Sequence, residues 1–319
     1  MKQIVGILLV KNEDLHIEWV IRNIFDFCDH IIVLDNYSTD DTYAIIERLA
    51  ANTDKIDLRK WKNPHASQSV LSAYYGTDTW VFGVDGDEVY DPNDLATLRK
   101  RIFAGEFDRV WWLRGNFHNC VSLDLNAQMA QGYPAPPAAC PVKLFNFKLI
   151  SGWKDEHRRQ RLHGYPIFAS GQSTVVLFAF VGDMSSWEGS QLKCLHLCFI
   201  ARSSSGEFKQ LFRLKHLKRR LFRKTSQIRH TVRANPHGAV AGRLKRCAVG
   251  EIVGRDISGF LGHVPEAFDN SFTHPVPSLT EQLRQGSGMQ LPAVLHLANG
   301  ETITCLRWIQ KKFKSIAGI

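Results

Sequence analysis

Short apolar segments alternate with helical patterns over the first 90 residues, and this alternation constrains the fold more than any other feature of the chain. Four apolar runs have the length and composition of buried strands: residues 4–10, 30–35, 56–61 and 80–84. Three segments between them are predicted to be helices: residues 13–25, 43–51 and 67–75. This order predicts a mostly parallel sheet, because parallel neighbours are joined by crossover connections that are usually helices.

Two helix starts carry capping signals. Asn12 is expected to cap the first helix, since its side chain can accept a hydrogen bond from a free N–H group of the first turn, with Glu13 and Asp14 inside that turn. Asp91 and Pro92 give the same signal for a helix after the fourth strand, as its cap and its first residue. Both helices are therefore expected to start close to a strand end.

The alternation loosens beyond Gly115. A proline-rich stretch at residues 132–141 is predicted to be a loop, because proline cannot donate to a strand ladder. Two later apolar runs, VKLFNF and TVVLFAFVG, are predicted to be strands. The 319 residues suffice for one large α/β domain or two smaller ones, and 44% of them are hydrophobic and can fill a core. The second half is therefore expected to have mixed α/β character.

Charge is distributed unevenly along the chain. Forty Lys and Arg against 31 Asp and Glu give a net charge of +9, with the acids concentrated in the first third and the bases between about residues 193 and 246. The apolar run at residues 174–182 is far shorter than the roughly 20 residues that a membrane span needs. No small-residue cleavage site follows the N-terminal apolar run. The chain is not expected to cross a bilayer.

The seven cysteines are odd in number and form no Cys-x-x-Cys pair, which favours reduced thiols in a cytosolic compartment. Cys194, His196 and Cys198 alternate along a predicted strand and would face the same side, where they could bind a metal. A structural zinc site needs a fourth ligand, and we find none in the sequence. Buried thiols are therefore the favoured interpretation.

Residues 79–92, TWVFGVDGDEVYDP, place the carboxylates of Asp85, Asp87 and Glu88 directly after the fourth apolar run. Alternation along an extended chain would put Asp85 and Asp87 on the same side, about 6 to 7 Å apart, close enough to serve one cation. A polar turn that leads into a helix would explain Asp91 and Asp94 but not these earlier acids. Because α/β sheets bind ligands at the carboxyl ends of their strands, we predict that Asp85 and Asp87 are functional.

Three blocks of the sequence together resemble the GT-A nucleotide-sugar glycosyltransferases, and in particular glycosyltransferase family 2. LLVKNEDLHIEWVIRN resembles the opening strand and helix of the family, HIIVLDNYSTDDT resembles its second strand and the turn that follows, and VFGVDGDE resembles its Asp-x-Asp strand end. The blocks occur in the family order over roughly the first 115 residues. The resemblance implies a GT-A-like α/β fold with a Rossmann-type, mostly parallel sheet.

The same resemblance implies a ligand set. Six positions match family residues that hold the nucleoside-diphosphate sugar: Asn12, Glu13, Asp35, Asn36, Asp85 and Gly86. Asp35 or Asn36 is expected to contact the base or the ribose. Mn²⁺ or Mg²⁺ on the diphosphate is expected to bind Asp87 directly. Asp85 is expected to contact the ribose or to reach the ion through water, and His196, later in the chain, is a further candidate ligand. A divalent ion there stabilises the charge that develops on the leaving group. Asp87 is expected to be a surface carboxylate that supports no core.

An inverting transferase also needs a carboxylate that accepts the proton of the acceptor hydroxyl. KLFNFKLISGWKDEHRR resembles a segment of related transferases in which an acid lies beside a histidine. Asp155 and Glu156 precede His157 here, whereas several relatives have the order His-Glu. Asp155 and Glu156 are therefore the first candidates for the catalytic base, and Glu188 is the third.

Two other functional classes fit parts of the sequence. DGDEV also resembles the opening motif of haloacid-dehalogenase phosphatases, in which Asp85 would be the nucleophile and Asp87 the acid/base. That motif normally opens its domain, whereas three strand–helix units precede it here. The other class is a basic module that binds nucleic acid or an anionic membrane through residues 208–246, which leaves the N-terminal half unexplained.

The segment 208–224 combines dense Lys and Arg with interleaved Leu and Phe and is predicted to be a helix. No nucleic-acid-binding motif accompanies this charge, so nucleic acid is not an expected partner. Basic residues near an anionic lipid surface contribute about 1 kcal/mol each, which favours peripheral attachment to the cytoplasmic face of a membrane.

We therefore predict a nucleotide-sugar-binding half at residues 1–115, an acceptor-binding half at 116–205 and a basic, largely helical C-terminal extension at 206–319. The expected reaction moves a sugar, with inversion, from a nucleoside diphosphate to a saccharide or lipid-linked acceptor in surface polysaccharide or glycolipid synthesis.

Overall fold

The computed structural model describes residues 1–134, 142–154, 161–170, 175–183, 186–198, 200, 202–205 and 253–261. The predicted alternation of strands and helices is confirmed in its first part. The elements follow as β1 (Gln3–Val10), α1 (Ile17–Ile24), β2 (His30–Asp35), α2 (Thr42–Ala50), β3 (Ile56–Lys60), η1 (Pro64–Tyr74) and β4 (Thr79–Val84). The predicted helix after the third strand is a 3₁₀ segment, η1.

The main sheet has seven strands in the order β12-β6-β9-β4-β1-β2-β3. Its later members are β6 (Val110–Arg114), β9 (Val142–Asn146) and β12 (Val176–Phe180), the last two in the runs predicted to be strands. Strands β4, β1, β2 and β3 are parallel, and β6 and β12 are parallel to each other. Strand β9 runs antiparallel between β4 and β6. The sheet is therefore mostly parallel with one reversed member.

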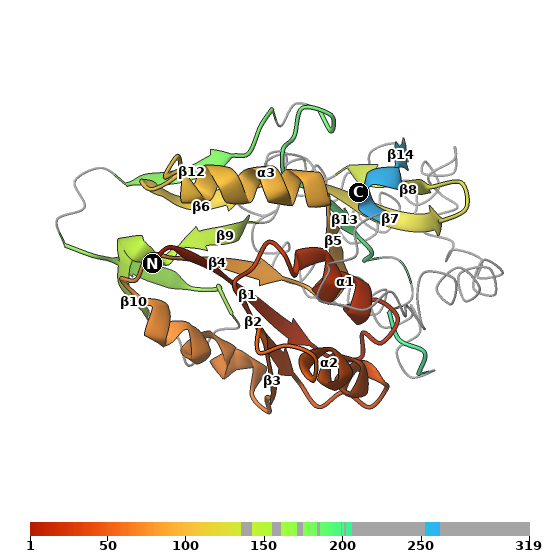
Figure 1. The fold of residues 1–319 in the computed structure, drawn as a ribbon, viewed down its shortest axis with the longest axis horizontal. Helices are drawn as coiled ribbons and strands as arrows, with labels where there is room; N and C mark the ends of the chain where they lie inside the picture. The colour runs from red at the N-terminus through yellow and green to blue at the C-terminus, as the bar shows by residue number, and fades with distance from the viewer. Residues whose placement is uncertain are drawn as a thin grey trace, which may run out of the picture.

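A second sheet of five strands has the order β14-β8-β7-β13-β5. It contains β5 (Glu88–Tyr90), β7 (Asn116–Asp124), β8 (Met129–Pro134), β13 (Lys193–His196) and β14 (Val253–Asp256). Figure 1 shows it beside the large sheet, on the side where β4 ends. Only a short turn separates β4 from β5, so the chain passes from one sheet to the other at Asp85–Asp87. Strand β8 extends to Pro134, into the stretch predicted to be a loop, because it pairs with β7.

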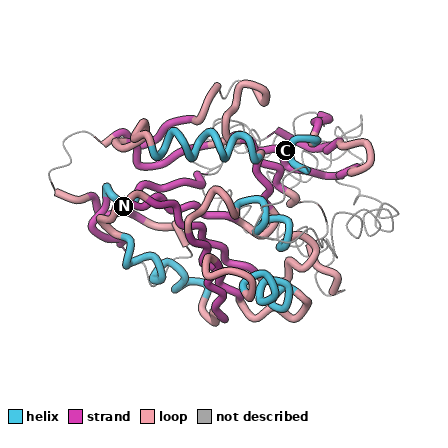
Figure 2. The backbone as a smooth tube through the Cα atoms, viewed as in Figure 1, coloured by secondary structure: helices cyan, strands magenta, loops and turns pink. Residues whose placement is uncertain are grey.

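Helical segments lie outside the layer of strands (Figure 2). Helices α1, α2 and α3 (Pro92–Phe103) pack their apolar residues on one face of the main sheet, for example Val20, Leu49 and Leu98. The other face is covered by η1, η3 (Phe147–Leu149) and the two-stranded sheet of β10 (Ile150–Lys154) and β11 (Tyr165–Phe168). A short helix, α6 (Ser258–Leu261), follows β14. Both faces of the main sheet are therefore covered by other elements.

The two predicted helix caps have opposite outcomes. Asp91 caps α3 as expected, since its side chain accepts hydrogen bonds from the N–H groups of Asn93 and Asp94. Asn12 does not cap α1, which begins at Ile17, and Glu13 and Asp14 precede that helix. The side chain of Asn12 is instead bonded to Thr39 in the turn after β2, a contact between neighbouring strand ends that local sequence does not reveal.

The predicted basic helix at 208–224 lies outside the described residues, as does most of the proposed C-terminal extension. Among the residues that the structure describes, no helix is long and apolar enough to cross a membrane.

Candidate active site

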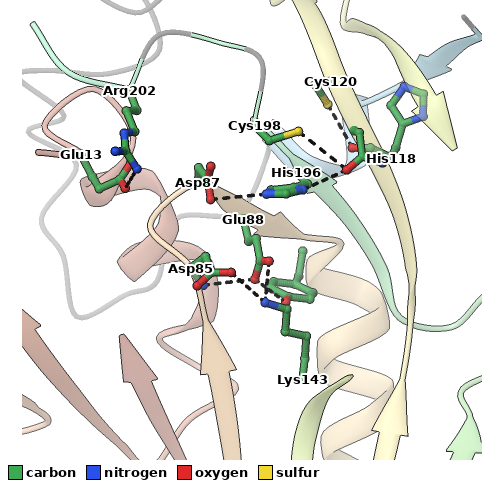
Figure 3. Close-up of polar contacts among 12 residues, drawn as sticks. Glu13, Asp85, Asp87, Glu88, His118, Cys120, Lys143, His196, Cys198 and Arg202 are labelled. Atoms are coloured by element: carbon green, nitrogen blue, oxygen red, sulfur yellow. Dashed lines mark hydrogen bonds and ion pairs between the residues drawn. The ribbon is translucent and has the colours of Figure 1, made fainter. Parts of the chain in front are cut away.

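Three carboxylates leave the carboxyl end of β4 within four residues. The backbone N–H of Asp85 donates to Glu88 Oε2 at 3.1 Å, and the N–H of Glu88 donates to the carbonyl oxygen of Asp85 at 3.1 Å. These reciprocal bonds close the turn that joins β4 to β5. The carboxylates of Asp85 and Glu88 face Lys143, whereas Asp87 points the other way, toward His196 (Figure 3).

Lys143, in the reversed strand β9, neutralises one side of this turn. Its Nζ lies 2.6 Å from Glu88 Oε1 and 3.0 Å from Asp85 Oδ2, and its side chain is buried. Burial alone would lower the pKa of Lys143, but the carboxylates of Asp85 and Glu88 outweigh it and raise that pKa. The ammonium is therefore fixed in its charged form. Sequence reasoning missed Lys143, although a lone lysine inside the apolar run VKLFNF was a usable signal.

Arg161 supplies a second cation to Asp85. Its guanidinium forms an ion pair with Asp85 Oδ1, and its backbone N–H donates to Ser67 Oγ at 2.8 Å. A Cβ atom at Gly83 would collide with Leu162 and lie 3.1 Å from Arg161 Nη1, so the glycine of β4 makes room for this segment. Glycine inside a strand often marks such a close approach, which was the signal available in the sequence.

The two cations set the ionisation of the acids. Burial alone would raise the pKa of Asp85, but Lys143 and Arg161 outweigh it and hold that pKa well below its usual range. Burial raises the pKa of Glu88 to about 8 against the pull of Lys143, with repulsion from Asp85 and Asp87 adding to the rise. The hydroxyl of Tyr90 donates to Glu88 Oε2 at 3.0 Å. Asp85 is thus the firmly ionised member of the cluster.

Asp87 is 2% exposed, which corrects the expectation of a surface carboxylate. Its Oδ1 lies 3.7 Å from His196 Nε2, because β13 pairs with β5 and brings His196 opposite Glu88. The other ring nitrogen, His196 Nδ1, is 2.9 Å from Asn119 Oδ1. Burial would lower the pKa of His196, but the charge of Asp87 outweighs it and raises that pKa. The structure therefore places Asp87 and His196, two of the residues predicted to bind the metal, beside each other.

Residues 202–205 tie the loop after β1 to the same region. Arg202 Nη1 donates to Glu13 Oε1 at 2.7 Å, and the N–H of Ser204 donates to Asp14 Oδ1 at 2.8 Å. A Cβ atom at Gly86 would lie 2.9 Å from Glu13 Cγ, so Glu13 packs directly on the turn after β4. Arg202 was not singled out from the sequence, because only the fold brings it to Glu13.

Asp35 and Asn36 have partners within the protein. Asp35 accepts hydrogen bonds from the N–H and the hydroxyl of Ser38, and Asn36 Nδ2 donates to the carbonyl oxygen of Trp61 at 2.8 Å. Both side chains hold the turn after β2 in place. A contact of either residue with a base or ribose stays a prediction.

The structure describes only one of the three candidates for the catalytic base. Asp155 and Glu156 lie outside the described residues. Glu188 is 74% exposed at its side chain and pairs with Arg255 at 3.1 Å. The neighbouring Trp187 packs on His118, whose side chain points to the opposite face of the second sheet from His196. The structure does not bring Glu188 to the turn after β4.

Two of the three residues considered as zinc ligands, His196 and Cys198, contact the same atom, Asn119 Oδ1. Cys194 is buried, which agrees with a buried thiol, and Cys198 Sγ donates to Asn119 Oδ1 at 3.7 Å. The described residues contain no group of three or more His, Cys, Asp or Glu side chains that could hold a metal on their own. Asp87 with His196 nonetheless offers one oxygen and one nitrogen ligand, which suits an ion that takes its remaining ligands from phosphate oxygens and water.

Known proteins are similar in sequence to the first part of this chain. Residues 7–129 match the family model described as Glycosyl transferase family 2, which confirms the predicted resemblance over this segment. The chain is 32% identical over 100 residues to the SPbeta prophage-derived glycosyltransferase SunS of Bacillus subtilis (strain 168), covering 31% of this chain and 24% of that protein. It is 32% identical over 104 residues to an uncharacterized glycosyltransferase of Rickettsia felis, covering 33% and 35%. The match thus spans about a quarter to a third of these relatives.

Two solved structures are similar over part of the chain. The crystal structure of S. aureus TarS 1–349 aligns with a TM-score of 0.34 at 17% identity and covers 49% of this chain and 51% of that one. The mannosyltransferase PcManGT from Pyrobaculum calidifontis, in complex with GDP-Man and Mn²⁺, aligns with a TM-score of 0.28 at 21% identity and covers 38% and 36%.

Proposed function

From a segment that matches glycosyl transferase family 2 over residues 7–129, we propose that this chain is a GT-A-type glycosyltransferase. It moves a sugar from a nucleoside-diphosphate donor to a saccharide or lipid-linked acceptor, with inversion at the sugar carbon. The halves at residues 1–115 and 116–205 would hold donor and acceptor respectively.

One observation carries this proposal. Within the matched segment, the buried parallel strand β4 is followed directly by Asp85-Gly86-Asp87, and Asp87 lies 3.7 Å from His196 of the second sheet. Ligands of α/β sheets bind at the carboxyl ends of the strands. A nucleotide diphosphate placed there would meet Asp87 and His196 on one side and the loop of Glu13 and Arg202 on the other.

Mn²⁺ or Mg²⁺ fits the donor set of this end of β4. Asp87 and His196 would hold the ion, with Asp85 acting through water or on the ribose, and the bound ion would neutralise charge on the leaving diphosphate. Lys143 and Arg161 keep Asp85 ionised and oriented, and two cations beside three acids leave little excess negative charge. The site is therefore expected to bind an ion weakly by itself and tightly together with a diphosphate.

Asp155 or Glu156 remains the proposed base that accepts the acceptor proton. The variants Asp155→Asn and Glu156→Gln should distinguish the two acids. Substitution of the true base should lower turnover and leave donor affinity intact, because the base acts on the acceptor. Full turnover in both variants would contradict this assignment.

A lipid-linked acceptor would suit peripheral attachment of the basic segment 208–224 to an anionic membrane surface, in surface polysaccharide or glycolipid synthesis. Co-sedimentation with anionic vesicles at low salt, and its loss at high salt, tests this attachment. Failure to sediment with either anionic or neutral vesicles at low salt would contradict it.

The function itself is tested by release of nucleoside diphosphate from a panel of UDP- and GDP-sugars, with Mn²⁺ and without it. The chain should release diphosphate from at least one donor in the presence of Mn²⁺, and Asp87→Asn should reduce that release by about 100-fold or more. Phosphate release from simple phosphomonoesters, with no donor consumed, would instead favour phosphatase chemistry at Asp85.

A further inference from the structure

Tyr37 has an unusual backbone conformation at the carboxyl end of β2. Its φ angle is +53°, in the left-handed region of backbone conformation that residues other than Gly, Asn and Asp rarely adopt. The residue is nevertheless 52% exposed, so burial of the ring does not explain the conformation. Residues held in such sparsely populated conformations persist where the surrounding structure fixes them, and they concentrate at binding and active sites.

The surrounding polar groups hold the turn in this conformation. The N–H of Asn36 donates to the carbonyl oxygen of Val10 at 2.8 Å, and the N–H of Ser38 donates to Asp35 Oδ2 at 3.1 Å. The N–H of Asn12 donates to Ser38 Oγ at 3.0 Å. The turn is therefore tied to the end of β1, and its polar side chains are engaged in supporting it.

This arrangement leaves an aromatic ring exposed where a ligand is expected. Strand β2 lies between β1 and β3, and all three are parallel, so their carboxyl ends meet at one edge. The strand ends on either side carry exposed lysines, Lys11 after β1 and Lys62 after β3. An exposed ring at a strand end whose two neighbouring strand ends carry cations suits a ligand with a flat aromatic base and a phosphate group.

We infer that Tyr37 stacks on the nucleobase of the donor nucleotide. This assignment rests on the proposed function and adds a specific donor contact to it. Stacking on a tyrosine ring uses the face of the base and tolerates different bases, so Tyr37 contributes affinity while other groups choose among nucleotides. A glycine would relax the backbone at this position but would offer no ring for stacking.

The test uses isothermal titration calorimetry with Mn²⁺ present and two kinds of probe: UDP or GDP, which carry a base, and inorganic pyrophosphate, which does not. Tyr37→Gly should weaken binding of both nucleotides by about tenfold and leave pyrophosphate binding unchanged. Tyr37→Phe should bind nucleotides like the wild type, since the ring remains. Tyr165→Ala, which removes an exposed ring from β11, is the control and should change neither.

Thermal melting of the free protein adds an independent readout. Tyr37→Gly should melt at the same temperature as the wild type or higher, because glycine adopts a positive φ without strain. Unchanged nucleotide affinity in Tyr37→Gly, or an equal loss for nucleotides and pyrophosphate, would overturn the stacking assignment alone. A wild-type chain that binds no nucleoside diphosphate would overturn the proposed function together with it.

Discussion

The acids and the cations of the candidate active site reach it by different routes. Asp85, Asp87 and Glu88 lie within four consecutive residues at the end of β4. Their counter-charges, Lys143 in β9 and Arg161 before β11, come from distant segments, as does His196 in β13, which lies beside Asp87. The acids are a local feature of the sequence, whereas the cations depend on the whole fold.

The Asp-x-Asp motif considered alone therefore overstates the negative charge of the site. Asp85 has two basic partners, and Glu88 shares one of them. A site whose own charges nearly cancel attracts a free divalent ion weakly, and a diphosphate must bring additional oxygen ligands. Substitution of one charged residue at a time removes one side of this balance.

Removal of Lys143 should have the largest effect on stability. Above about pH 8, where Glu88 is ionised, Lys143→Met leaves its carboxylate buried without an ammonium partner, and breaking a buried pair by removing one member typically costs about 3–5 kcal/mol. The free energy of unfolding, measured in urea, should fall by that amount, and the double variant with Glu88→Gln should recover part of it. Lys148→Met is the matched control, because Lys148 is half-exposed and lies 3.8 Å from Asp78, a pair worth less than about 1 kcal/mol. Equal losses in the two lysine variants would contradict the account.

Glu88 should make the free energy of unfolding fall as the pH rises, whereas a carboxylate whose pKa is lowered by folding makes it rise. Its pKa is raised from 4.5 to about 8 by burial, so the folded state keeps a proton that the unfolded chain releases. The resulting stability is fully present below pH 4.5 and is lost as the pH rises through about 8. The difference in unfolding free energy between wild type and Glu88→Gln should therefore shift against the wild type between pH 5 and 8. A difference that stays constant over this interval would show that Glu88 does not titrate there.

Arg161→Gln should have the smallest effect and should reveal the charge balance directly. Asp85 would lose one of its two cations, so Mn²⁺ affinity in the absence of nucleotide should rise by about fivefold, equivalent to roughly 1 kcal/mol. Electron paramagnetic resonance of free Mn²⁺ measures this affinity. Arg59→Gln, which breaks the pair with Asp57 in β3, is the matched control and should leave it unchanged. Unchanged or weaker affinity in Arg161→Gln would mean that the arginine does not oppose ion binding.

The sequence predicted the parts of this molecule that depend on local pattern. The strands β1 to β4 and the Asp91 cap follow from apolar runs and from one side chain beside its own helix. The match to family 2 over residues 7–129 confirms the resemblance that those blocks suggested.

The remaining features depend on contacts between distant residues. Asn12 was expected to cap α1, but Thr39 from the next strand end competes for its side chain. The pairing of Arg161 with Asp85 spans 76 positions, and no periodicity reports such a contact. Gly83 and Lys143, two residues out of place in apolar strands, were the available hints.

We propose that the end of β4 binds a divalent ion and a nucleoside diphosphate together, and calorimetric titration of UDP and GDP with and without Mn²⁺ measures this coupling. In the wild type at least one nucleotide should bind at least tenfold more tightly with Mn²⁺, and Asp87→Asn should abolish that difference while retaining the weaker, metal-free binding. An Mn²⁺-dependent gain of the same size in Asp87→Asn, or nucleotide binding in the wild type that ignores Mn²⁺, would contradict the account.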